Sequence, residues 1–124
     1  MMKTPLLVSV VDDDESVRES LPDLLGEFGF TARTFSSAEE FLASEAISQT
    51  MCLILDIAMP GMGGLDLQRE LEHRRIEIPI IFITAQPEEA VRSLAPGNGA
   101  VQCLLKPFSD TALLHALDAV LKGK

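Results

Sequence analysis

Short apolar runs alternate with amphipathic stretches along the whole of this 124-residue chain. Five of the runs are predicted to be strands, and most of them are rich in Val, Ile or Leu rather than strictly alternating, which is typical of parallel strands that are covered on both faces. The predicted strands are residues 6–11, 30–35, 51–56, 80–84 and 101–105. The pattern therefore predicts a sheet with helices on both sides.

Between these strands, apolar side chains recur at the three- and four-residue spacing of helices. The predicted inward faces are Val17, Leu21, Leu24, Leu25 and Phe28; Ala38, Phe41 and Leu42; Leu67 and Leu71; and Leu113, Leu114, Leu117, Val120 and Leu121. Ser109 and Asp110 are both suitable N-caps for the last of these helices. Each strand is thus followed by a segment expected to be helical.

Alternating strands and helices predict an α/β fold with a parallel sheet and right-handed crossovers. For five units we expect the flavodoxin-like doubly wound (βα)5 three-layer sandwich, with the parallel sheet in the order 2-1-3-4-5 and one domain over residues 1–124. Such folds bind ligands beyond the carboxyl ends of the strands, where the winding reverses between the first and third strands. The residues to inspect therefore follow positions 11 and 55.

Carboxylates occupy both of these places. Asp12 and Asp13 follow the first strand, and Asp56 ends the third. Because neighbouring strands lie about 4.8 Å apart, the three side chains are expected to converge. Two carboxylates at about 5 Å repel by about 3 kcal/mol at an effective dielectric constant near 20, and a hard divalent cation relieves that repulsion. We therefore predict a site for Mg²⁺ or Mn²⁺, whereas Asp14 and Glu15 suit the start of a helix.

Two further polar residues belong to the same edge of the predicted sheet. Thr84 ends the fourth strand, and Lys106 follows the fifth. A hydroxyl donor and a cation facing a metal-bound carboxylate are what phosphoryl transfer requires, because they stabilise the charge on the phosphoryl oxygens. Asp56 is then the predicted nucleophile, and the product is an aspartyl phosphate.

Charge and composition exclude several other classes of protein. The chain carries 19 acidic and 10 basic residues, a net charge of -9, which argues against direct nucleic-acid binding. No apolar run approaches the roughly 18 residues that a membrane span needs. Two cysteines are too few for a disulfide scaffold. We expect a cytoplasmic location and no membrane partner.

Four motifs, in order, resemble the receiver domain of two-component response regulators. They are Val11-Asp12-Asp13-Asp14, Leu55-Asp56-Ile57-Ala58-Met59-Pro60-Gly61-Met62-Gly63-Gly64, Ile83-Thr84-Ala85 and Lys106-Pro107-Phe108. The resemblance spans nearly the whole chain and is strongest to the FixJ-like branch, whose output half is a LuxR-type helix-turn-helix. It implies control of transcription through an output domain that is absent here.

The resemblance also implies roles for the acidic residues. Asp56 would accept the phosphoryl group of a phosphohistidine on a sensor histidine kinase. Asp13, Asp56 and the backbone carbonyl of Ala58 would bind the metal ion directly, whereas Asp12 would act mainly through water. Thr84 and Lys106 would each contact a phosphoryl oxygen.

Two departures from the family pattern concern signal output. Cys103 stands where the family usually has an aromatic side chain coupled to Thr84. Pro96 and Gly97 interrupt the predicted fourth helix, within residues 86–99, so we expect that helix to be short. In the family the fourth helix, the fifth strand and the fifth helix form the output face, where a self-dimer or an output domain would dock.

Two other functions remain as alternatives. A dedicated aspartyl-phosphate phosphatase is not expected, because such enzymes need an acid two residues after the nucleophile, where this chain has Ala58. The chain would instead promote only its own Mg²⁺-dependent phosphorylation and dephosphorylation. An interaction module that no longer switches through the usual Thr–aromatic pair is the second alternative, favoured by Cys103 and disfavoured by the intact acidic residues.

Overall fold

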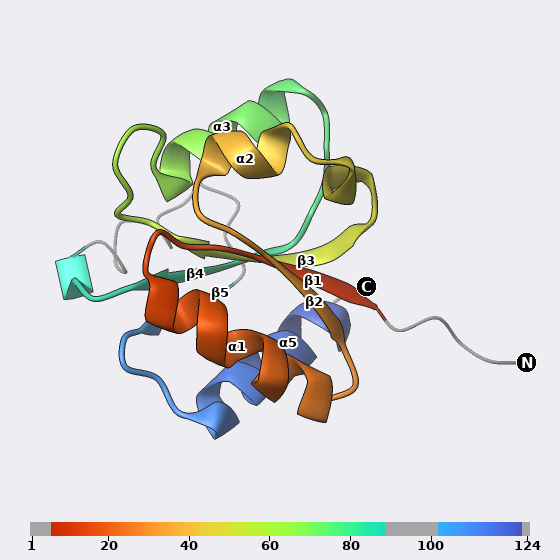
Figure 1. Ribbon diagram of the computed structural model, residues 1–124, viewed down its shortest axis with the longest axis vertical. Helices are drawn as coiled ribbons and strands as arrows, with labels where there is room; N and C mark the ends of the chain where they lie inside the picture. Colours follow the sequence, from red (N-terminus) through yellow and green to blue (C-terminus); the bar gives the residue numbers. More distant parts are fainter. Residues whose placement is uncertain (1–5, 89–101, 123–124) are drawn as a thin grey trace, which may run out of the picture.

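Five parallel strands form one sheet in the computed structural model, which describes residues 6–88 and 102–122. The strand order is β2-β1-β3-β4-β5, so the predicted topology is confirmed (Figure 1). The strands are β1 (Leu7–Val11), β2 (Thr31–Phe35), β3 (Thr50–Asp56), β4 (Ile80–Thr84) and β5 (Gln102–Leu105). Their observed starts lie within one residue of the predicted ones.

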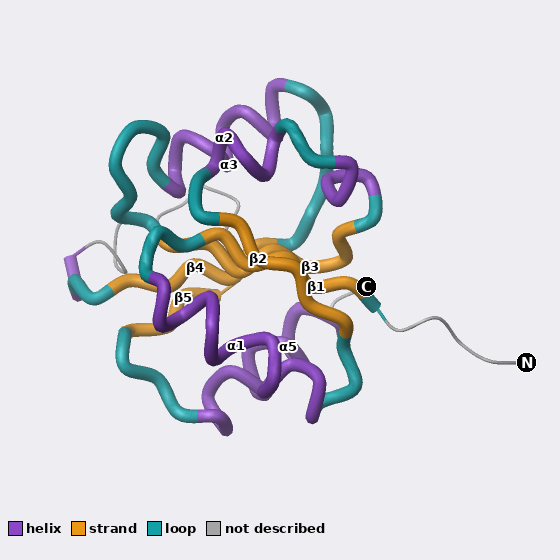
Figure 2. The backbone as a smooth tube through the Cα atoms, viewed as in Figure 1, coloured by secondary structure: helices purple, strands orange, loops and turns teal. Residues whose placement is uncertain are grey.

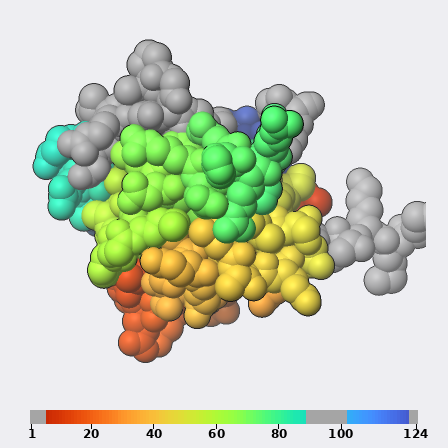
Figure 3. All heavy atoms as spheres, turned by 90° about the horizontal axis from the view of Figure 1, so that it is seen from above, coloured from red at the N-terminus to blue at the C-terminus, as the bar shows by residue number. Residues whose placement is uncertain are grey.

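Helices cover both faces of this sheet. They are α1 (Glu15–Glu27), α2 (Ala38–Leu42), α3 (Gly64–His73) and α5 (Asp110–Lys122), with a 3₁₀ helix, η1 (Glu45–Ser48), before β3. Helices α2 and α3 lie on one face and α1 and α5 on the other, with the strands between them (Figure 2). Seen from above, α2 and α3 lie side by side (Figure 3). The predicted fourth helix falls mostly in residues 89–101, outside the described residues.

The apolar runs form strands because both faces of the sheet are buried. In β3, Cys52 and Ile54 contact the cluster beneath α1 and α5, whereas Leu53 and Leu55 contact the cluster beneath α2 and α3. All four side chains are fully buried. Successive side chains of the strand point to opposite faces of the sheet and thus pack into two different cores, so consecutive positions are apolar.

The prediction that Leu114 of α5 faces the core is wrong. Leu114 is 36% exposed, because the buried stripe runs through Leu113, Ala116, Leu117 and Val120. These positions repeat at intervals of three and four residues, and Leu114 lies about 100° away around the helix. The small side chain of Ala116 completes the stripe that the larger Leu114 was expected to fill.

Polar side chains cap the N-termini of α1 and α5. Asp14 is the N-cap of α1, and its Oδ1 accepts hydrogen bonds from the N–H and the hydroxyl of Ser16. Ser109, one of the two predicted caps, accepts from the N–H of Ala112 at 3.0 Å at the start of α5. Within the described part of the chain, no helix has the length and apolar character needed to cross a membrane.

The connection from β3 to α3 depends on glycine. A Cβ atom at Gly64 would lie 2.6 Å from the carbonyl oxygen of Asp56 and 2.9 Å from the Cα of Ile57. The N–H of Gly64 also donates to the carbonyl of Ile57 at 2.9 Å. Only a residue without a side chain permits this approach, which holds the start of α3 against the end of β3.

Candidate functional site

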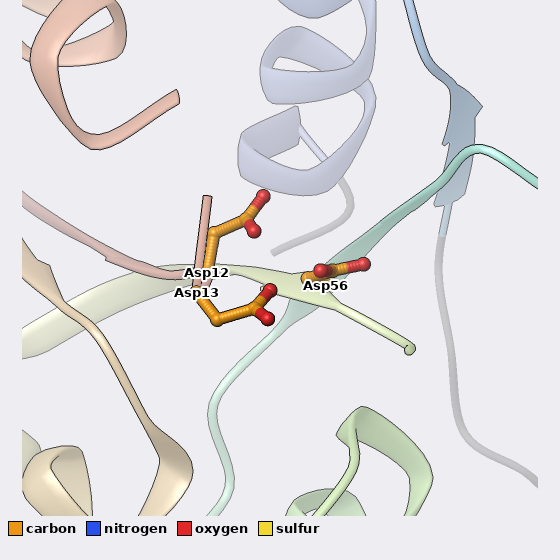
Figure 4. Close-up of side chains that lie close together, drawn as sticks. All are labelled: Asp12, Asp13 and Asp56. Atoms are coloured by element: carbon orange, nitrogen blue, oxygen red, sulfur yellow. The ribbon is translucent and has the colours of Figure 1, made fainter. Parts of the chain in front are cut away.

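Three carboxylates meet at the carboxyl edge of the sheet. Val11 of β1 is paired with Leu55 of β3, so the next residues in register are Asp12 and Asp56. Asp12, Asp13 and Asp56 each offer an oxygen that lies within 4.8 Å of the other two (Figure 4). Asp12 and Asp56 are buried, whereas Asp13 is exposed. The structure therefore brings together the three acids singled out in the sequence.

Lys106 enters this cluster from the end of β5. Its Nζ lies 2.9 Å from Asp12 Oδ2 and 3.7 Å from Asp56 Oδ2. Among the described residues, none donates a well-oriented hydrogen bond to the buried Asp12 Oδ2. The contact with Lys106 is therefore chiefly between charges. The sequence placed Lys106 at this edge, but its closer approach to Asp12 than to Asp56 was not foreseen.

The charges in the cluster shift two pKa values. Burial, together with the charge and hydrogen bonding of Asp12, raises the pKa of Asp56 to about 7, although Lys106 and the Ala58 N–H act in the opposite direction. Burial disfavours the charged form of Lys106, but Asp12 and Asp56 outweigh it and raise the pKa of that ammonium. Lys106 therefore stays protonated and offsets only part of the negative charge around it.

The donor set suits a hard divalent cation. It consists of three carboxylates at close range, and one buried oxygen in it has no directed donor among the residues described. Oxygen ligands of this kind fit Mg²⁺ or Mn²⁺, and a dication would relieve the repulsion that raises the pKa of Asp56. Ala58, whose carbonyl is a predicted ligand, follows closely, and its N–H donates to Asp56 Oδ1 at 3.3 Å.

Thr84 lies at the same edge, at the end of β4. Its side chain is fully buried, and its Oγ1 accepts a hydrogen bond from the N–H of Gln86 at 3.1 Å. Its carbonyl accepts from the N–H of Lys106 at 2.8 Å, which ties the end of β4 to the start of the loop after β5. The peptide bond that follows, from Lys106 to Pro107, is cis.

The two cysteines lie on opposite faces of the sheet. Cys52 belongs to the cluster beneath α1 and α5, and Cys103 contacts the cluster beneath α2 and α3. Their strands, β3 and β5, are also separated by β4. Cys103 is half-buried.

An apolar groove adjoins the acidic cluster, between α1 and the loop from β5 to α5. Val17, Leu21 and Leu24 line it from α1, and Pro107 and Phe108 line it from the loop. Acidic residues stand around these side chains, and Lys106 reaches both the groove and the cluster. A partner protein bound in the groove would therefore contact Lys106, which is itself 3.7 Å from Asp56.

Sequence reasoning missed one residue that contacts the acidic loop. Arg18, in the first turns of α1, donates a hydrogen bond from Nη1 to the backbone carbonyl of Asp12 at 2.9 Å. Its only sequence signal is its position six residues after Asp12, on the helix that follows the acids.

Comparisons with known proteins agree with this fold. The family described as response regulator receiver domain matches residues 8–118. Nodulation protein W of Bradyrhizobium diazoefficiens is 45% identical over 116 residues, which cover 94% of this chain and 51% of that protein. The structure of the response regulator StyR has a TM-score of 0.84 at 45% identity and covers 94% of this chain and 59% of that one. The crystal structure of FixJ-N has a TM-score of 0.83 at 35% identity, covering 99% and 98% respectively.

The chain spans about half the length of the curated relatives it matches. The matched segment contains all four motifs that carry the resemblance, and it includes the described sheet from the second residue of β1 onward. The chain belongs to the receiver domain family of two-component response regulators.

Proposed function

We propose that Asp56 accepts a phosphoryl group from the phosphohistidine of a sensor histidine kinase, in a reaction that depends on Mg²⁺ or Mn²⁺. The observation that carries this proposal is the convergence of Asp12, Asp13 and Asp56 within 4.8 Å of one another, with the Lys106 ammonium beside them. A carboxylate in this setting is a suitable nucleophile, because the Lys106 ammonium, together with a divalent cation once bound, would stabilise the charge on the incoming phosphoryl group.

In the transfer step, a carboxylate oxygen of Asp56 forms the new bond to phosphorus. The P–N bond to the kinase imidazole breaks, and its electron pair stays on the imidazole nitrogen. Lys106, already 3.7 Å from Asp56, would pair with one phosphoryl oxygen. Thr84 would donate its hydroxyl hydrogen to another. A bound divalent cation would supply positive charge that neutralises the carboxylates and the phosphoryl oxygens.

Direct ligands of the cation would be Asp13, Asp56 and the backbone carbonyl of Ala58. Asp12, whose Oδ2 already contacts Lys106 at 2.9 Å, would act mainly through water. This division agrees with their exposure, since Asp13 is exposed and Asp12 is fully buried. The chain would promote its own phosphorylation and dephosphorylation, without acting as a dedicated enzyme on other substrates.

The kinase would dock at the apolar groove between α1 and the β5–α5 loop, which is lined in part by Lys106, the residue whose Nζ lies 3.7 Å from Asp56 Oδ2. Phosphorylation would then alter the output face, which includes β5 and α5, where Leu105 and Leu114 are exposed. A self-dimer or an output domain that controls transcription would bind there. We place residues 1–124 in one receiver domain that works in the cytoplasm.

Mass spectrometry after incubation with phosphoramidate and Mg²⁺ tests the proposal, because this donor has a P–N bond like that of phosphohistidine. We expect a gain of about 80 Da, the mass of one phosphoryl group. Borohydride reduction of the product should then locate the modified residue at position 56. The gain should disappear with EDTA and in Asp56→Asn.

Asp23→Asn is the matched control, since Asp23 is an exposed carboxylate on α1 outside the acidic cluster. It should be phosphorylated like the unaltered chain. A gain in mass that persists in Asp56→Asn, or that is lost equally in Asp23→Asn, would contradict the proposal.

Cys103 favours one second candidate, an interaction module that does not switch through the usual Thr–aromatic pair. The half-buried thiol contacts the cluster beneath α2 and α3, and it cannot fill the volume of an aromatic ring. Beryllofluoride with Mg²⁺ separates the two functions. Changes in amide chemical shifts that extend from Asp56 to β5 and α5 would indicate a receiver that switches. Changes confined to the acidic loops would indicate an interaction module that does not switch.

A further inference from the structure

The Arg18 side chain hydrogen-bonds to a backbone carbonyl, which is an unusual partner for an arginine in an acidic region. Its side chain is half-buried, and Glu15 and Glu19 stand nearby on the same helix. Across residues 6–88 and 102–122, no carboxylate lies within ion-pair distance of its guanidinium. The guanidinium instead donates to a neutral acceptor, the backbone carbonyl of Asp12, at 2.9 Å.

This carbonyl belongs to the peptide group that joins Asp12 to Asp13. The other side of Asp12 is also held, because its N–H donates to the carbonyl of Phe35 in β2 at 3.1 Å. The N–H of Asp14 donates to Asp12 Oδ1 at 2.9 Å, which fixes the side chain. Arg18 therefore supplies the contact that sets the plane of the Asp12–Asp13 peptide, and this plane determines where the Asp13 backbone leads.

Fixing this plane matters most for Asp13. The Asp13 side chain is exposed, and no described residue donates a hydrogen bond to its carboxylate. Its direction toward Asp12 and Asp56 depends on the backbone that carries it. A rotation of the peptide would move its oxygen out of the 4.8 Å cluster.

We propose that Arg18 is a positioning residue for the divalent-cation site, acting through its hydrogen bond to the Asp12 carbonyl; this proposal rests on the proposed function. Groups that orient metal ligands from outside the coordination shell contribute to affinity without touching the ion. Arg18 belongs to this class because its side chain donates to the backbone of the loop that carries two of the acids, and not to a carboxylate of the cluster.

The sign of the effect separates positioning from simple electrostatics. A positive charge near the acids repels a dication, so its removal should tighten cation binding if charge alone matters. Removal of a positioning contact should instead weaken binding, because the Asp13 carboxylate becomes less ordered. The two explanations of Arg18 thus predict opposite changes in the dissociation constant.

Isothermal titration calorimetry with Mg²⁺ tests this on the whole chain, using Arg18→Met, Arg18→Lys and Arg69→Met. We expect about tenfold weaker binding in Arg18→Met, the lower end of the range for such residues. Arg18→Lys keeps a donor that can reach the carbonyl and should recover most of the affinity. Arg69→Met removes an equal charge from the surface of α3, where the Arg69 side chain is 74% exposed, and should bind like the unaltered chain.

Equal or tighter Mg²⁺ binding by Arg18→Met, with the unaltered chain binding normally, would overturn the role of Arg18 and leave the proposed function intact. Absence of Mg²⁺ binding by the unaltered chain at millimolar concentration would instead overturn the proposed function. Urea unfolding followed by circular dichroism checks that each variant is folded. If Arg18→Met does not fold, Arg18→Gln, whose side chain is too short to keep the contact, gives the same test.

Discussion

The interior of the sheet and its carboxyl edge differ sharply, although they belong to the same strands. In β3, Ile54 and Leu55 are fully buried among apolar side chains. The next residue, Asp56, is also buried, but it faces Asp12 and Asp13 and keeps a proton up to about pH 7. One step along the strand thus separates optimal packing from unfavourable charge repulsion.

This difference shows where stability and chemistry reside in the molecule. The two apolar clusters stabilise the sheet, and the stability of the sheet keeps like charges at a distance that isolated side chains would avoid. The edge is destabilising without a cation, and that same feature would give it affinity for one. The comparison predicts that changes in the interior are costly under all conditions, whereas changes at the edge depend on pH and metal.

Ile54→Ala should have the largest effect. It removes a fully buried side chain from the cluster beneath α1 and α5 and should lower the free energy of unfolding by about 4 kcal/mol. Urea unfolding followed by circular dichroism measures this, since the chain has no Trp or Tyr to report by fluorescence. The loss should be the same with and without Mg²⁺.

Leu114→Ala is the matched control for this change, because Leu114 is 36% exposed. It should lower the free energy of unfolding by less than about 1 kcal/mol. A loss as large as that of Ile54→Ala would mean that the exposed side of α5 is covered by another part of the protein.

Asp56→Asn should have an intermediate effect of the opposite sign. The pKa of Asp56 is raised from 3.8 to about 7, so folding takes up a proton between these values, and stability falls as pH rises through the window. At about pH 8 in EDTA the variant should be more stable by about 2 kcal/mol, because the repulsion is gone.

The gain from Asp56→Asn should shrink toward zero near pH 4, where the native carboxyl is protonated. It should also shrink when Mg²⁺ is added, because the cation stabilises only the chain that keeps Asp56. Unfolding curves at both pH values, with and without Mg²⁺, check both statements. A gain that did not vary with pH would show that Asp56 carries no repulsion in the folded state.

Lys106→Met should have a smaller effect than either Ile54→Ala or Asp56→Asn. Its ammonium contacts Asp12 Oδ2 at 2.9 Å with the Lys106 side chain 19% exposed, so its removal leaves the acids less well compensated. We expect a loss of about 1 kcal/mol at neutral pH without Mg²⁺. The loss should be smaller in the Asp56→Asn background, and a double-mutant cycle measures this coupling. Additive losses would place Lys106 outside the cluster's electrostatics.

Much of the fold followed from short-range patterns. Short apolar runs identified all five strands, most clearly β3 and β4, whose residues are apolar at nearly every position because both faces of these strands are buried. The order of strands followed from the alternation of strands and helices, and with it the meeting of Asp12, Asp13 and Asp56. Leu114 was misplaced, because apolar character alone does not show which of two adjacent leucines faces the core.

Contacts within the site were harder to foresee. The hydrogen bond of Arg18 to the Asp12 carbonyl and the closer approach of Lys106 to Asp12 both involve long, flexible side chains with several possible partners. Their choice depends on the distances between α1, β1 and β5 in the folded chain. Sequence periodicity carries no information on such distances.

The order of apolar and acidic residues along the chain was sufficient to predict the layers of the fold. It also predicted the functional edge of the sheet and the residues that gather there, because backbone topology brings the strand ends together whatever their side chains. Only the packed structure decided which acid is most buried, which contacts Lys106 and how far the pKa of Asp56 rises. These properties depend on desolvation and on separations of a few ångströms, which arise when elements distant in sequence are packed against one another.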